Sequence, residues 1–273
     1  PEDTTIEGIT EMNFLAVGTS TTNEGALTTN GIPDVGETFD TFATGSITQL
    51  TGAGGSLDPT GFNTAFDTTP GSPDSLLVGF GFESFELTFT FEVSGVFTSL
   101  DANDANFIHT AAGTGNTTGE LKFYIDNTTG DAVTDLDAKT GTTDGVHVAT
   151  FEIQAGDGGV FNFLTADGTD DATFQMTYGK AGVWFDKNGN DLSANPDAIL
   201  GFTDSNFDGK PDPQADPFTF NPAGHDCGAN TATDFCFRED GSYVLAGEIP
   251  EPSTIGLMGL GLLGLSRSLR RKI

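Results

Sequence analysis

Hydrophobic and polar residues alternate along several segments of the chain, most regularly in residues 83–93. From Phe85 to Val93 every second position is hydrophobic, and Glu or Thr lies between. Alternation of this length predicts a β-strand with one buried face and one solvent-facing face. Shorter runs of the same kind predict further strands at residues 39–50, 121–125, 149–153, 161–163, 174–178, 183–185, 218–220 and 243–245.

Turn-forming residues fill the segments between these strands, and 37 of the 273 residues are Gly. Gly, Asn, Asp and Pro form tight turns at little conformational cost. No segment before residue 253 repeats its hydrophobic residues with the period of a helix. We therefore expect an all-β fold, an antiparallel β-sandwich with jelly-roll or Greek-key connections. A closed antiparallel barrel is the alternative.

Two segments depart from this pattern. Residues 186–216 are too polar and too numerous for a simple hairpin, so we expect a long acidic loop that leaves the sandwich. Residues 1–30 show little alternation apart from a hydrophobic run at 14–17, which indicates one edge strand and a loose leader. We expect residues 1–249 to form the β-sandwich domain and residues 250–273 to form a separate C-terminal segment.

The C-terminal segment combines three features in order. The turn-forming triplet Pro250-Glu251-Pro252 comes first, an uncharged run at 255–265 follows, and basic residues end the chain. These basic residues are Arg267, Arg270, Arg271 and Lys272. A helix that crosses a bilayer needs about 20 apolar residues, so the uncharged run is a short hydrophobic helix that barely spans one. The basic residues would hold its end in the cytoplasm.

This order of features resembles the PEP-CTERM sorting signal of Gram-negative bacteria, which an exosortase reads. The resemblance implies a protein that is exported, anchored transiently in the inner membrane, and delivered to the cell surface or the extracellular matrix. An ordinary C-terminal membrane anchor is the alternative. Because export is implied, we also expect an N-terminal signal peptide to have preceded Pro1. Bacteria with this signal usually make extracellular polysaccharide.

The formal net charge is −30, from 40 acidic and 10 basic residues. Nucleic acids and anionic lipids are bound through Lys and Arg, so this balance disfavours both as partners and leaves only the C-terminal segment to contact a membrane. Excess carboxylates instead attract divalent cations, and calcium is abundant outside cells. Solubility through net charge alone is the alternative. The 24 Phe residues argue against a disordered chain.

The clearest candidate for a calcium loop lies at residues 204–212. An EF-hand loop uses oxygen ligands at relative positions 1, 3, 5 and 9, a backbone carbonyl at position 7, and Gly at position 6. In this chain these positions hold Asp204, Asn206, Asp208, Asp212, Lys210 and Gly209, respectively. The segment resembles the first nine positions of such a loop, but Ala215 replaces the bidentate Glu. A solvated acidic turn is the alternative.

A second, weaker pattern of the same kind begins at Asp186. The chain places Asn188, Asn190 and Asp197 at its positions 3, 5 and 12, whereas position 6 holds Asp191 in place of Gly. Chance acidic turns rarely repeat this spacing, so the pair of segments favours Ca²⁺ as the expected cofactor.

The two cysteines, Cys227 and Cys236, are separated by eight residues. In an oxidising compartment such a pair usually forms a disulfide, and a loop of this size would be stabilised by about 2–3 kcal/mol. Zinc binding is the alternative, with His225 as the plausible neighbouring ligand.

The sequence contains no recognisable catalytic pattern. His109, His147 and His225 are far apart, and none has the spacing of a nucleophile and base or of metal ligands. Trp184 is interpreted as a core residue, with a sugar-stacking platform as the alternative. We expect that the protein is not an enzyme. A hydrolase of matrix glycans is an alternative, because two suitably spaced carboxylates suffice for it.

Residues 14–18, 35–39 and 42–55 are similar to flocculation-associated PEP-CTERM proteins. The similarity implies a role without catalysis in floc formation, together with exopolysaccharide. We expect an exported structural protein that promotes aggregation or biofilm cohesion, with calcium bridging its carboxylates to exopolysaccharide or to other copies of itself. A subunit of an extracellular filament, joined by β-strand addition, is a further alternative.

Overall fold

The computed structural model describes residues 9–23, 32–52, 55–57, 86–101, 103–126, 143, 145–162, 167–184, 190–196, 199–208 and 234–247. Its strands are β1 (Ile9–Asn23), β2 (Thr38–Gly52), β3 (Gly55–Leu57), β4 (Glu86–Asp101), β5 (Asp104–His109), β6 (Glu120–Asp126), β7 (Val146–Ile153), β8 (Gly158–Asn162), β9 (Asp167–Gly179), β10 (Ile199–Asp208) and β11 (Asp234–Gly247). A short 3-10 helix, η2 (Leu192–Ala194), lies between β9 and β10. The predicted strand at 218–220 and the predicted C-terminal helix lie outside the described residues.

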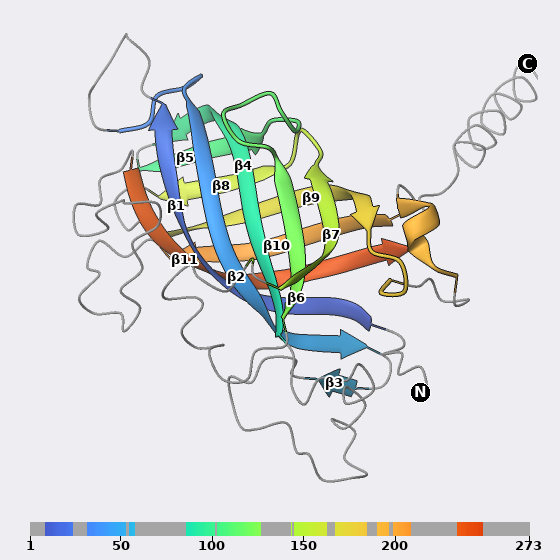
Figure 1. Ribbon diagram of the computed structural model, residues 1–273. Coiled ribbons are helices and arrows are strands. Elements are labelled where there is room, and N and C mark those ends of the chain that lie inside the picture. The colour runs from blue at the N-terminus through green and yellow to red at the C-terminus, as the bar shows by residue number, and fades with distance from the viewer. Residues whose placement is uncertain are drawn as a thin grey trace, which may run out of the picture.

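The strands form two layers that face each other across the core (Figure 1). One layer contains β1, β2, β4, β6 and β7 in this order, and the other contains β11, β10, β9, β8 and β5. In Figure 1 the strands of the two layers run at a large angle to each other, as in sandwiches with orthogonal packing. All pairings between these strands are antiparallel, so the predicted all-β antiparallel fold is confirmed.

Hydrogen bonds join the two layers into one continuous sheet. β1 pairs with β11, β7 pairs with β9, and β4 pairs with β5, and each of these pairings connects one layer to the other. Among the described strands, only the short β3 has a partner on one side alone, since it pairs with β2 and with no other strand. Unpaired strand edges are the usual sites of strand addition. Because nearly all of the described strands have partners on both sides, they offer few sites for it.

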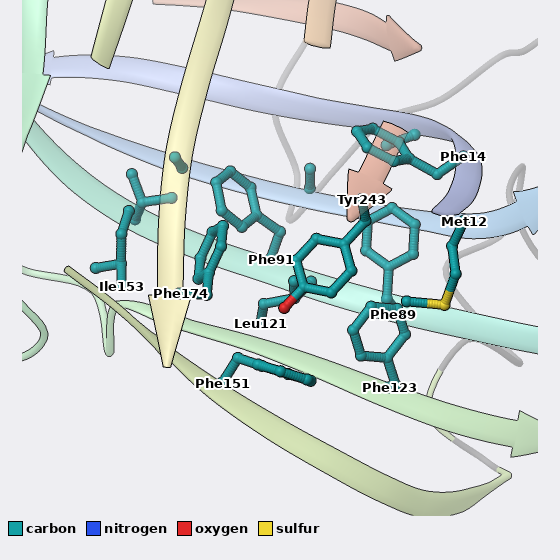
Figure 2. Close-up of a cluster of buried hydrophobic side chains, with 14 of the residues drawn as sticks. Met12, Phe14, Phe89, Phe91, Leu121, Phe123, Phe151, Ile153, Phe174 and Tyr243 are labelled. Carbon is teal, nitrogen blue, oxygen red and sulfur yellow. The ribbon is translucent and has the colours of Figure 1, made fainter. Parts of the chain in front are cut away.

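Phenylalanine dominates the space between the layers. Phe123 is 1% exposed, and its ring lies 5.9 Å from Phe89, 5.9 Å from Phe151 and 5.6 Å from Tyr243, measured between ring centroids. Figure 2 shows these side chains converging from strands of both layers. Gly201 in β10 permits this packing, because a Cβ atom there would lie 1.8 Å from the Tyr243 hydroxyl oxygen.

Most predicted strands are present, and several are longer than predicted. The strand predicted at 183–185 is wrong in its described part, because Val183 ends a turn and Trp184 has no strand partner. The predicted acidic loop at 186–216 is also wrong in part, because β10 lies within it and pairs with β9 and β11. The sequence also failed to indicate β5 and the first half of β11.

The missed strands share polar or small residues on their inner faces. The inner positions of β10 include Gly201, Thr203 and Ser205, which show no hydrophobic alternation. On β11 the buried Glu239 interrupts the series that Phe237 and Tyr243 would otherwise indicate. Among the residues that the structure describes, no helix has the length and apolar composition needed to cross a membrane.

Candidate functional site

A cluster of four polar side chains lies between the layers, among the aromatic rings. It is formed by His109 at the end of β5, Asp170 of β9, Ser205 of β10 and Glu239 of β11. Successive strand residues point to opposite faces of a sheet, and each of these residues has an inward position on its strand. His109 is 2% exposed and Glu239 is 7% exposed, so the cluster is deeply buried.

His109 and Asp170 form a buried ion pair. The His109 Nε2 atom lies 2.6 Å from the Asp170 Oδ1 atom. Burial acts to lower the pKa of His109, but the carboxylate of Asp170 outweighs it, so that the pKa of His109 is raised. The other ring nitrogen, Nδ1, is buried without a hydrogen-bond partner among the described residues.

Ser205 connects Glu239 to the rest of the cluster. The Ser205 Oγ atom lies 2.5 Å from the Glu239 Oε1 atom and 3.1 Å from the backbone oxygen of Asp170. Burial, together with the nearby charge of Asp170, raises the pKa of Glu239 to about 7. A hydroxyl group has one proton and can donate only one of these two hydrogen bonds. A protonated Glu239 donating to Ser205 satisfies both contacts, which agrees with the raised pKa.

Two small cavities border this cluster. The larger has a volume of about 40 Å³ and is walled mainly by Phe side chains together with His109, Asp170 and Glu239. The smaller, of about 20 Å³, is also lined by Asp170 and Glu239, and in addition by Tyr243. A water molecule needs roughly 10–15 Å³ of such space, so these cavities suit individual waters and are far too small for a sugar ring.

The arrangement is suited to proton binding rather than to nucleophilic catalysis. Ser205 contacts Glu239 and a backbone carbonyl, whereas the hydrogen-bonded nitrogen of His109 contacts Asp170. A serine nucleophile requires its hydroxyl within hydrogen-bonding reach of the base. We therefore expect the cluster to make the stability of the fold depend on pH. The sequence analysis did not predict this cluster, because its residues are far apart in the chain.

The residues predicted to form the first calcium loop lie partly in a strand. Asp204, Asn206 and Asp208 belong to β10, and their backbones pair with β9 and β11. The prediction of a loop is wrong for these three residues, because an EF-hand loop curls around its ion whereas a strand is extended. Lys210 and Asp212 lie outside the described residues.

The second predicted calcium segment is described only in part. Asn190 is exposed, and Asp186, Asn188 and Asp197 lie outside the described residues. Its neighbour Asp191 accepts hydrogen bonds from the backbone N–H groups of Ser193 and Gly182, at 2.9 and 2.8 Å, and so caps η2. Among the described residues, no group of three or more His, Cys, Asp or Glu side chains is arranged to bind a metal. Calcium binding stays a prediction.

Trp184 and the cysteines complete the predicted set. Trp184 packs against the core, 6.4 Å from Phe123, and its indole N–H donates to the backbone oxygen of Val148 at 2.8 Å, which supports its interpretation as a core residue. Cys236 lies in β11 opposite Thr19 of β1. Cys227, the Pro-Glu-Pro triplet and the basic C-terminal residues lie outside the described residues, so the disulfide stays a prediction.

The fold and the cluster together define an all-β protein in which one antiparallel sheet closes on itself around a core that contains buried polar side chains. Comparison with protein families adds the cellular context. The model of the PEP-CTERM protein-sorting motif matches residues 248–272, so the chain carries this sorting signal there. Such a signal implies processing by an exosortase and export toward the cell envelope or beyond. No curated protein matches the chain.

Proposed function

We propose that the protein is a structural component of the cell surface or extracellular matrix of a Gram-negative bacterium. It acts without catalysis and promotes flocculation or biofilm cohesion together with exopolysaccharide, after a transient stay in the inner membrane. The observation that carries this proposal is the sorting motif at residues 248–272, placed after an acidic all-β body.

The geometry of the body supports a structural role. The strands of the described residues are joined by continuous pairing, and the two cavities described between them, of about 40 and 20 Å³, are too small to admit a sugar chain. A protein of this shape interacts through its outer faces and its connections. This favours adhesion over the alternative of a glycan hydrolase, which needs a cleft wide enough for a sugar chain.

Calcium is part of the proposal, as a bridge between carboxylates and acidic polysaccharide or other copies. The register supports a modified arrangement, in which Asp204 lies opposite Asp171 and Asp208 lies opposite Asp167. Oxygen-bearing residues of two neighbouring strands thus occupy adjacent positions. A calcium ion could take ligands from both strands, whereas the predicted loop would use a single segment. Calcium bound to the folded state at 100 times its Kd would stabilise the protein by about 2.7 kcal/mol.

The calcium proposal is tested with the purified protein. We expect the melting temperature to rise on addition of calcium and to fall again with EDTA, while magnesium at the same concentration has a smaller effect. Asp208→Asn with Asp204→Asn should abolish the calcium response, whereas Asp34→Asn, in the turn before β2, should not. An identical melting temperature with EDTA and with calcium would remove calcium from the proposal.

The function itself is tested in the bacterium that makes the protein. Deletion of the gene should reduce floc or biofilm formation, and the intact gene should restore it. A gene in which Pro250-Glu251-Pro252 is replaced by Ala-Ala-Ala should fail to restore it, with the protein retained in the cell fraction. Normal flocs in the deletion strain would contradict the proposal.

The filament alternative is less supported by the structure. Strand addition requires an open sheet edge, and β3 is the only described strand that pairs on one side alone. A filament would therefore have to form through β3 or through segments outside the described residues. Elongated assemblies seen by electron microscopy with the Thr51→Pro variant as well as with the wild type would show that the β2 and β3 edge is not needed.

A further inference from the structure

The outer surface of β6, β7 and β9 carries a row of three aromatic side chains. These strands are neighbours in the order β6, β7, β9 (Figure 1). Tyr124 of β6 and His147 of β7 are opposite each other in register, with ring centroids 5.4 Å apart. The ring of His147 stacks on Tyr178 of β9 at 4.8 Å and an interplanar angle of 16°. The row therefore crosses three strands and leaves Tyr178 42% exposed.

The backbone is adapted to this row. The register of β6 with β7 shifts between Phe123 and Tyr124, and the register of β7 with β9 shifts between Thr150 and Phe151. Such β-bulges change the direction of side chains and are common beside functional sites. On β7 the first shift lies between His147 and Ala149 and the second lies after Thr150, so both irregularities follow His147 closely.

The row is also held in a fixed position. The Nε2 atom of His147 is 2.9 Å from the Thr150 hydroxyl oxygen and 2.9 Å from the backbone oxygen of Ala149. Trp184 also holds β7 next to His147, because its indole N–H donates a hydrogen bond to the backbone oxygen of Val148. Aromatic groups that are already ordered lose little entropy when a ligand packs against them.

Polar groups border the aromatic row. On β6, Lys122 is two positions from Tyr124 and therefore on the same face, and its Nζ atom is 2.6 Å from Glu120 Oε2. Lys122 is opposite Thr150, which is in turn opposite Tyr178. Donors and acceptors thus lie directly beside exposed aromatic surface.

We propose that this row binds a strand of uncharged polysaccharide. Pyranose rings have an apolar C–H face that packs on aromatic rings and a rim of hydroxyl groups that needs donors and acceptors. His147 covers one face of the Tyr178 ring, so the sugar would pack on the remaining exposed surface of Tyr178, and the polar border would bind its hydroxyl groups. The net charge of −30 opposes a polyanionic chain, and Glu120 beside the row adds to this. The inference deepens the proposed function, on which it rests, by naming the class of glycan and the face that holds it.

Isothermal titration calorimetry of the whole chain tests the proposal with cellohexaose, an uncharged chain, and hexagalacturonate, an acidic chain of the same length. We expect cellohexaose to bind at millimolar concentration and hexagalacturonate not to bind in the presence of EDTA. Tyr178→Ala should raise the Kd for cellohexaose about three- to tenfold, and Tyr124→Ala should have an effect of the same direction. Tyr178→Phe should keep most of the affinity.

Val244→Ala is the matched control, because Val244 of β11 is 39% exposed and so resembles Tyr178 in exposure. It should leave the Kd unchanged, and melting temperatures should show that all variants are folded. No heat from cellohexaose with the wild type, equal binding of both hexasaccharides, or an unchanged Kd in Tyr178→Ala would overturn the proposal. The proposal would also be overturned if Tyr178→Ala dissociated an oligomer of the protein without changing the Kd for cellohexaose. The aromatic row would then be a contact between copies of the chain.

The two proposals fail separately. If the deletion strain loses its flocs but Tyr178→Ala binds cellohexaose as the wild type does, the aromatic row is wrong and the matrix function stands. If Tyr178→Ala loses affinity for cellohexaose while the deletion strain forms normal flocs, the row is a glycan site and the matrix function is wrong.

Discussion

The buried cluster predicts that the protein loses stability as the pH rises from about 4.5 to about 7, and Glu239→Gln isolates the contribution of Glu239. Glu239 is 7% exposed and its pKa is raised to about 7 by burial, with a contribution from Asp170. Glutamine has nearly the same shape and no charge, and its amide N–H can donate to Ser205 as a protonated carboxyl group does. The variant therefore keeps the packing and removes only the ionisation.

The magnitude follows from the difference between the folded and unfolded pKa values. Between pH 4.5 and about 7 the unfolded chain has lost this proton while the folded protein retains it. The free energy of unfolding then falls by about 1.4 kcal/mol per pH unit, or about 3 kcal/mol in total. His109 acts in the same direction. Because its pKa is raised, its stabilising pair with Asp170 is complete below pH 6.5 and is lost as the pH rises through the folded value.

Urea denaturation followed by the fluorescence of Trp184, the single tryptophan, measures this effect. At pH 8 we expect Glu239→Gln to be more stable than the wild type by about 3 kcal/mol, and at pH 4.5 to be equal to it within about 1 kcal/mol. Glu152→Gln is the matched control, since it removes the same charge from a partly exposed position on β7.

The comparison with the control separates two explanations. If relief of the net charge of −30 were responsible, both substitutions would stabilise the protein alike at pH 8. A difference between the two variants that appears only above pH 4.5 locates the effect in the core. The reasoning would be refuted if Glu239→Gln were less stable than the wild type at pH 8. It would also be refuted if the free energy of unfolding of this variant fell with pH as steeply as that of the wild type.

Further substitutions test the packing around the cluster. Phe123→Ala should cost about 3–5 kcal/mol in the free energy of unfolding, because it removes a side chain that is 1% exposed and contacts four other rings, and Phe123→Leu should cost less. Urea midpoints for the two variants check this, and a cost below about 1 kcal/mol for Phe123→Ala would contradict the described core. Tyr243→Phe should stabilise by about 1 kcal/mol, because the Tyr243 hydroxyl group is buried without a hydrogen-bond partner among the described residues. Gly201→Ala should destabilise by about 1–3 kcal/mol, since its Cβ atom would lie 1.8 Å from that hydroxyl oxygen. Adding Tyr243→Phe to Gly201→Ala should recover part of the loss, and strictly additive effects in this double-mutant cycle would show that the two residues are not in contact.

The same cluster explains which parts of the fold could be predicted from the sequence. β6 and the first half of β4, up to Val93, have hydrophobic residues at every inward position, and simple alternation identified both. β10 has Ser205 and β11 has Glu239 at inward positions, so the alternation that indicates a strand is absent although the residues are buried. The long polar stretch was therefore interpreted as a loop, and the β10 residues Asp204, Asn206 and Asp208 were assigned, with Lys210 and Asp212, to an EF-hand-like calcium loop.

The candidate sites were harder to predict than the strands, for a geometric reason. His109 and Asp170 are 61 positions apart in the chain and Ser205 and Glu239 are 34 apart, so only the strand order brings these pairs together. The aromatic row depends in addition on two register shifts, which no periodicity in the sequence reveals. The sorting signal was recognisable because its three parts are contiguous and need no tertiary structure.

The closed pairing of the strands restricts where a matrix protein of this kind can bind its partners. The two cavities described between the strands have volumes of about 40 and 20 Å³, and both are too small for a glycan. Among the described strands, each one except β3 pairs on both sides along at least part of its length, which limits strand addition. Binding is thus left to the outer faces, and among these the surface of β6, β7 and β9 combines ordered rings with hydrogen-bonding groups. An acidic surface with one aromatic row would bind neutral glycan directly and acidic glycan only through cations. Binding of acidic glycan should therefore require calcium, whereas binding of neutral glycan should not.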